Sequence, residues 1–187
     1  MSVNTNWETC KNAKLNTTNN DEFSESKYIP SNFTISTHLN QKAANVDLTG
    51  KPAPDWILTD TNNNSVAFKN LKSRVLMIQF TGIGCPPCHA SIPFLKKLVT
   101  EYDVKNFEFI SIEAWSRNID GVRRYQNKND LKYKFLLSTD EIIKRYHVDL
   151  VPEFFIIDKK RIIRKVINGY EEGVTDKEIR DRIKELI

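Results

Sequence analysis

Residues 75–90 read VLMIQFTGIGCPPCHA, and this stretch decides the fold class. Its first six residues, Val75–Phe80, form a nearly continuous apolar run of strand length, as expected of a central buried strand. Cys85 and Cys88 follow, and apolar side chains then recur at helical spacing over residues 93–102. The pattern predicts a cysteine pair at the point where a buried strand passes into a helix.

Strand and helix patterns alternate on both sides of this stretch. A polar turn at residues 62–64 separates two short apolar segments, which predicts a hairpin before the buried strand. The order of elements is typical of an α/β domain with a central mixed β-sheet flanked by helices. The predicted strands are residues 56–58, 66–68, 75–80, 107–112, 154–157 and 162–167, and the predicted helices are residues 93–102, 119–127, 140–146 and 175–187.

The first 49 residues differ in composition from the rest. They are rich in Asn, Thr, Ser and Lys and keep no sustained period, although residues 33–35 fit a short strand. The segment GKPAP at residues 50–54 then interrupts regular structure. We expect a partly disordered N-terminal extension over residues 1–49 and one domain over residues 50–187.

Charge and hydropathy argue against several classes of protein. Lys and Arg are interspersed with Asp and Glu at a net charge of +4, so we expect no binding to nucleic acid. No window approaches 18 apolar residues, and no signal peptide is visible at the start. Membrane attachment would therefore require an anchor that is absent from this sequence.

Three cysteines are too few for a disulfide scaffold or a four-thiolate zinc site. Cys85 and Cys88 are three residues apart, while Cys10 lies far away, which is the pattern of a redox pair plus a bystander. At a helix N-terminus, free N–H groups and the helix dipole stabilise a thiolate. We therefore interpret Cys85 as the nucleophile and Cys88 as the thiol that resolves the mixed disulfide. The alternatives are two buried thiols or half of a metal site.

The neighbours of the pair support redox chemistry but leave alternatives open. Pro86 loses no needed hydrogen bond in the first helical turn, and Pro87 stiffens the loop. With His89, the motif also matches the C-x-x-C-H pattern of c-type haem attachment, although an α/β context does not suit a helical haem pocket. The pair Val151-Pro152 precedes a predicted strand, as an ordinary edge feature or as a cis proline packed against the cysteines.

Together these motifs resemble the thioredoxin superfamily, in particular its TlpA/ResA-like branch of extracytoplasmic reductases. The resemblance rests on GKPAP at residues 50–54, on the strand–CPPC–helix unit with its helix-kinking Pro93, and on Val151-Pro152. The spacing between CPPC and that proline also matches, including an inserted strand and helix at residues 107–127.

The resemblance implies a thioredoxin-like fold in which Cys85 attacks, Cys88 resolves and Pro152 is a cis proline facing them. It implies that the partners are protein disulfides or dithiols, including apocytochromes in cytochrome c biogenesis, with an upstream thiol as electron donor. The redox-active disulfide then replaces any bound cofactor or metal. By the same analogy we expect a monomer in a periplasmic or cell-envelope location.

The sequence departs from these relatives at three places where many of them carry a functional side chain. Gly84 stands where many have Trp, Ser91 where several have Glu, and Gln79 where thioredoxin has an acid. The proton of the resolving thiol must therefore leave by another route. The candidate groups are His89, Glu113 and Glu153, although carboxylates at such positions are more often solvated surface groups.

Three functions follow from these observations. The first is disulfide exchange with protein substrates, as a reductase rather than an oxidant, although C-P-x-C-H is also the pattern of the oxidant DsbA. The second is a non-catalytic thioredoxin-like binding module or metal carrier, and the third is a c-type haem protein. The peroxiredoxins (AhpC/TSA-like) are a related alternative, but they need Thr where this chain has Gly82.

Overall fold

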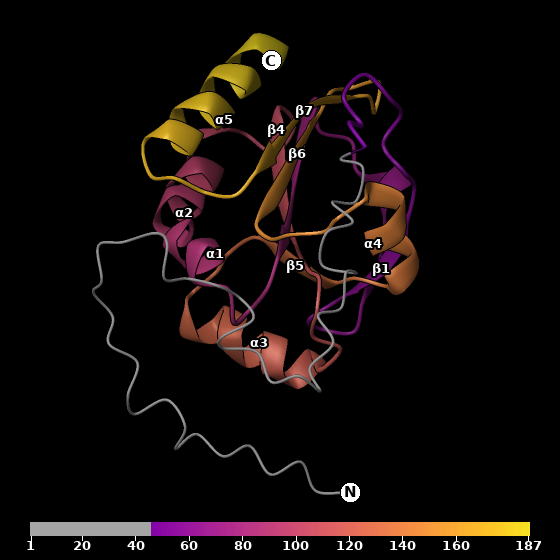
Figure 1. Ribbon diagram of the computed structural model, residues 1–187, viewed down its shortest axis with the longest axis vertical. Coiled ribbons are helices and arrows are strands. Elements are labelled where there is room, and N and C mark those ends of the chain that lie inside the picture. The colour runs from indigo at the N-terminus through magenta and orange to yellow at the C-terminus, as the bar shows by residue number, and fades with distance from the viewer. Residues whose placement is uncertain (1–45) are drawn as a thin grey trace, which may run out of the picture. The chain divides into compact units, whose positions relative to one another are not determined.

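A seven-stranded mixed sheet runs through residues 46–187, the part of the chain that the computed structural model describes (Figure 1). In sheet order the strands are β2 (Ser65–Ala67), β1 (Ile57–Asp60), β5 (Lys134–Leu137), β4 (Phe107–Glu113), β3 (Val75–Thr81), β6 (Glu153–Ile157) and β7 (Ile163–Asn168). β3, β4 and β5 are parallel, whereas β6 and β7 continue the sheet by antiparallel pairing. β1 pairs antiparallel with both β5 and β2.

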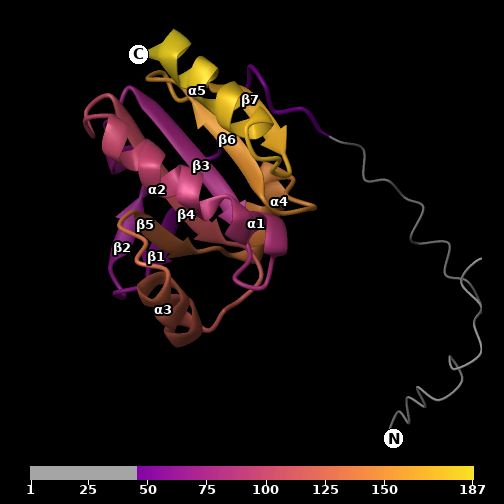
Figure 2. The same ribbon diagram turned by 90° about the vertical axis from the view of Figure 1, so that its left-hand side faces the viewer.

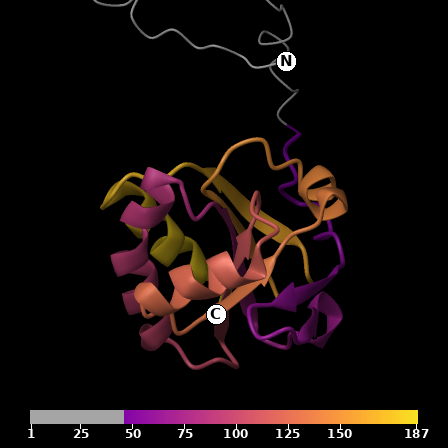
Figure 3. The same cartoon turned by 90° about the horizontal axis from the view of Figure 1, so that it is seen from below.

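Helices cover both faces of the sheet, which confirms the predicted α/β class. They are α1 (Pro86–Ala90), α2 (Ile92–Glu101), α3 (Ile119–Lys128), α4 (Asp140–Tyr146) and α5 (Val174–Leu186), with a short 3-10 helix, η5 (Phe68–Asn70). Figure 2 shows α1, α2, α3 and α5 in front of one face. Figure 3 shows α4 on the other side of the sheet.

The two helical layers explain why β3 reads as a continuous apolar run. Leu76 and Ile78 point into the core beneath α4, whereas Val75 and Met77 point into the core beneath α2 and α5. All seven residues of β3 are buried. Burial of one large apolar side chain contributes about 1.5–3 kcal/mol. The buried side chains of β3 therefore hold the strand between the two helical layers and fix the position of its carboxyl end.

The structure differs from the sequence-based prediction among the strands. It adds β5, a four-residue strand whose pattern is too short to separate it from a loop, and which pairs with β1 and β4. The helix after the cysteines is divided into α1 and α2 at Ser91, which keeps a helical backbone, in agreement with the expected kink near Pro93. Pro93, which has no N–H to donate, lies directly after this kink.

The chain joins the domain just before β1. Leu48 is buried in the core beneath α4, and Gly50 N donates a 2.8 Å hydrogen bond to Ile163 O at the start of β7. Residues 1–45 of the predicted extension, together with the strand expected at residues 33–35 and Cys10, lie outside the described residues.

Candidate functional site

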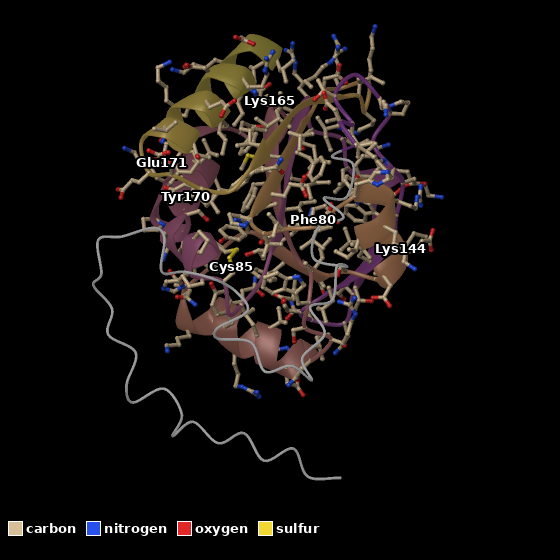
Figure 4. All side chains as sticks on the ribbon, viewed as in Figure 1. Phe80, Cys85, Lys144, Lys165, Tyr170 and Glu171 are labelled. Carbon is tan, nitrogen blue, oxygen red and sulfur yellow. A yellow bond between two sulfur atoms is a disulfide. The ribbon has the colours of Figure 1, made fainter. Side chains whose placement is uncertain are left out.

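The cysteine pair lies where β3 passes into α1, as the sequence predicts. Cys85 is the N-cap residue of α1, with an extended backbone, and Pro86 and Pro87 occupy the first helical turn. Cys88 N donates a hydrogen bond of 3.2 Å to Cys85 Sγ. The two sulfurs are joined in a disulfide (Figure 4), and the side chains are 6% and 2% exposed. Cys85 is therefore the more accessible of the two.

The loop before β6 brings a second segment to the disulfide. The Val151–Pro152 peptide bond is cis, and Val151 O lies 3.5 Å from Cys85 Sγ. This places the expected proline segment beside the cysteine pair although Pro152 follows Cys88 by 64 positions in the sequence.

A buried chain of neutral polar groups lies beneath the pair. Ser91 Oγ donates a 2.7 Å hydrogen bond to Cys88 O and accepts one of 3.2 Å from Gln79 Nε2. Gln79 Oε1 in turn accepts a 3.3 Å hydrogen bond from Ser111 Oγ. Gln79 and Ser91, the two positions at which an acid is missing, therefore bond to each other, and the polar groups of this region are satisfied without a charge.

Glu113, at the end of β4, is buried rather than solvated, so the expectation of a surface carboxylate was wrong. Its Oε2 accepts a hydrogen bond from Ile83 N (2.9 Å), and its Oε1 accepts from Trp115 N (3.2 Å) and Ser116 N (2.9 Å). Burial raises the pKa of the Glu113 carboxyl, and these N–H donors and Arg117 offset part of that rise. The carboxyl ties the loop before Cys85 to the loop after β4.

Glu153 is also buried, which again contradicts the expectation of a solvated group. Its Oε2 has no hydrogen-bond partner, and burial, with a smaller contribution from Asp149, raises its pKa to about 8. The side chain lies on the α4 face with Phe155 and Tyr146, and it lines a pocket of about 530 Å³ there. The α1 helix lies on the opposite face.

His89 follows the pair on α1 and is exposed. Its Nδ1 lies 3.3 Å from the hydroxyl oxygen of Tyr125 on α3, and the two rings meet edge to face. Within residues 46–187, His89, Glu113 and Glu153 make no hydrogen bond to either cysteine sulfur.

Trp115 lies beside the turn that leads to Cys85, at a position to which the sequence pattern assigned no role. The side chain is 61% exposed, and its indole lies against Gly82. A Cβ built on Gly82 would lie only 2.6 Å from Trp115 Cε3, whereas one built on Gly84 would meet nothing within 4 Å. A contact between two loops leaves no periodic pattern in the sequence, so it could not be predicted from the sequence pattern.

Two further features of the described residues bear on a metal carrier and on membrane attachment. Among residues 46–187, no three His, Cys, Asp or Glu side chains are grouped so that they would hold a metal ion. None of the helices described is both long and apolar enough to cross a membrane.

Several known proteins are similar to this chain in sequence or in structure. A ResA thiol-disulfide oxidoreductase of Bacillus cereus is 31% identical over 136 residues, which cover 67% of this chain and 78% of ResA. ResA of Bacillus thuringiensis subsp. konkukian is 29% identical over 138 residues, with 73% and 78% covered. A thiol:disulfide interchange protein of the thioredoxin family from Chlorobium tepidum TLS superposes with a TM-score of 0.64 over 75% of this chain and 98% of its own, at 21% identity.

The solved structure supports the fold alone, because its sequence identity is low. The Redoxin family model matches residues 48–183, which is nearly the whole described domain and includes the cysteine pair and the cis proline. With this match, the ResA similarity and the geometry of the disulfide, the chain belongs to the Redoxin family and is a ResA-like member of the thioredoxin superfamily.

Proposed function

We propose that this protein is a thiol–disulfide oxidoreductase that exchanges disulfides with protein partners through Cys85 and Cys88. The observation that carries the proposal is the disulfide at the start of α1, with its more accessible sulfur beside Val151. The ResA relatives, which are named thiol-disulfide oxidoreductases, support the same activity.

In the dithiol form, the Cys85 thiolate attacks one sulfur of a partner disulfide, whose other sulfur leaves as a thiolate. Cys88 then attacks Cys85 Sγ and breaks the mixed disulfide, and both partner sulfurs depart as thiols. Two electrons thereby pass to the partner, together with the proton of Cys88 and a second proton from water that replaces the one Cys85 had released, and the Cys85–Cys88 disulfide forms. An upstream thiol donor restores the dithiol by the reverse steps, so the cycle requires no bound cofactor.

We further propose that the protein acts as a reductase. Strong oxidants of this chemistry stabilise their reduced form, in which the attacking cysteine is a thiolate. Here the two polar contacts of Cys85 Sγ are one N–H donor, from Cys88, and one carbonyl oxygen, from Val151. A carbonyl dipole opposes negative charge on the sulfur, so the thiolate is only modestly stabilised.

The location and the neighbouring groups complete the proposal. We place the protein outside the cytoplasm, in the periplasm or attached to the cell envelope, by analogy with the ResA-like branch. Pro152 then faces the partner, and Pro86 and Pro87 hold the turn in which Cys85 is presented. Because Gln79 and Ser91 are neutral, the proton of Cys88 passes to the departing partner thiolate rather than to a carboxylate beneath the pair.

The test uses single cysteine variants in a Cys10→Ser background, which removes the third thiol. Cys88→Ser is expected to trap a mixed disulfide with a disulfide-bonded protein substrate such as insulin, whereas Cys85→Ser is expected to trap none and to lose insulin reduction. Retained activity in Cys85→Ser would overturn the proposal. Equilibration with glutathione decides the direction, since a potential near −270 mV, about that of thioredoxin, fits a reductase and one near −120 mV, about that of DsbA, does not.

A further inference from the structure

Trp115 is exposed at a place where the fold does not need an exposed aromatic ring. It follows β4 by two residues, and its side chain is 61% exposed. Trp56, the other tryptophan in residues 46–187, is buried in the core beneath α4. Tryptophan is enriched at sites where a protein contacts another protein, because its large flat surface loses little conformational entropy on binding.

The backbone around Trp115 is held in place by a buried group. One Glu113 oxygen accepts the N–H groups of Trp115 and Ser116, and the other oxygen accepts that of Ile83. A carboxyl that bridges two loops in this way fixes their relative position. The indole is therefore presented on an anchored backbone, which reduces the entropy lost when a partner binds it.

The indole also lies directly against the turn that leads to the reactive cysteine. Its ring carbons contact Gly82, and Gly82 O accepts a 2.9 Å hydrogen bond from Cys85 N. Gly84, between them, is exposed, and the space beside its Cα is open. A polypeptide that reaches Cys85 along this turn therefore passes close to the exposed indole of Trp115.

Resting on the proposed function, we propose that Trp115 is the aromatic contact with which this protein selects its disulfide partners. The partner is an extended polypeptide segment that carries an apolar side chain next to its reactive cysteine. Burial of such a side chain on the indole removes apolar surface from water on both molecules. Glutathione disulfide has no apolar side chain of this kind, so it gains nothing from the contact. Glu113 acts as a positioning residue.

The test compares two disulfide-linked peptide dimers that differ only in the residue before cysteine, which is leucine in one and serine in the other. The rate at which the reduced protein cleaves each dimer is measured in a single turnover, and the ratio of the two rates is the readout. We expect the protein to prefer the leucine dimer by about tenfold, the range of one strong interface contact. Trp115→Ala is expected to bring this ratio close to one, and Trp115→Phe to keep most of it.

Ile57→Ala is the control, because Ile57 is also a large apolar side chain of similar exposure (65%) but lies on β1, three strands from β3 in the sheet. It is expected to leave the ratio unchanged. A wild-type ratio in Trp115→Ala, or the absence of any preference in the wild-type protein, would overturn the inference and leave the proposed function intact. Failure of the wild-type dithiol to cleave either dimer would instead overturn the proposed function.

Discussion

Replacing Glu153 with glutamine is expected to remove a dependence of stability on pH that the wild-type protein carries. Glu153 is only 6% exposed on the α4 face, and its Oε2 has no hydrogen-bond partner. Burial raises its pKa from the ordinary value of 4.5 to about 8. Between these two values the folded protein keeps the proton, whereas the unfolded chain releases it.

The sign and size of the effect follow from this difference. A raised carboxyl pKa contributes stability that is fully present below pH 4.5 and is lost as the pH rises toward 8. Each pH unit within this window lowers the free energy of unfolding by about 1.4 kcal/mol. Between about pH 5.5 and about pH 7.5 the loss amounts to about 2.5 kcal/mol. Glutamine has the shape of the protonated acid but does not titrate in this range. The free energy of unfolding of the variant therefore lacks this dependence on pH.

Urea denaturation of the oxidised protein at about pH 5.5, 6.5 and 7.5 measures the effect. The Glu153→Gln variant is expected to gain about 2.5 kcal/mol relative to the wild-type protein over this range. Glu172→Gln, which changes an exposed glutamate, serves as the control and is expected to show no such gain. If the difference between wild type and Glu153→Gln stays constant across the three pH values, the assignment of a raised pKa to this carboxyl is wrong.

Two further predictions concern the loops around the site. Gly82→Ala is expected to destabilise the fold by about 1–3 kcal/mol, because its Cβ would overlap the Trp115 indole, whereas Gly84→Ala changes stability by less than about 0.5 kcal/mol. Equal urea midpoints for the two variants would contradict the packing of Trp115 on Gly82. Asn118→Ala is expected to cost about 1 kcal/mol, since Asn118 Oδ1 caps α3 by accepting the N–H of Gly121 at 3.1 Å, and an unchanged thermal midpoint would rule this cap out.

The reactive cysteines were predictable because their chemistry depends on local order. A buried strand followed by CPPC places Cys85 at the start of a helix. The apolar run of the strand, the preference of proline for the first helical turn and the N-cap position all depend on neighbouring residues, so they do not require knowledge of the rest of the chain. Most helices and strands were predictable for the same reason. The strand β5 was not, because four residues carry too little periodicity, and its pairing with β1 and β4 decides its structure.

The surroundings of the pair were not predictable in the same way. The sequence shows carboxylates at positions 113 and 153 but not whether they are buried, because burial depends on which loops and helices cover them. The hydrogen bonds from Gln79 to Ser91 and from Ser111 to Gln79 connect β3, the α1–α2 junction and β4, which lie far apart in the chain. Such long-range contacts leave no period in the sequence.

The sequence by itself therefore determined the fold class and the redox pair, because strand and helix periods, turn residues and the CPPC motif act over a few residues. The proline segment that faces the pair followed only from the resemblance to the family. Only the tertiary structure decided that Gln79, Ser91 and Ser111 form a hydrogen-bonded chain beneath the pair, that Glu113 joins two loops, and that Trp115 lies exposed beside Gly82. These features arise where segments that lie tens of residues apart in the sequence come together. The pairing of the strands in the sheet decides which side chains meet there.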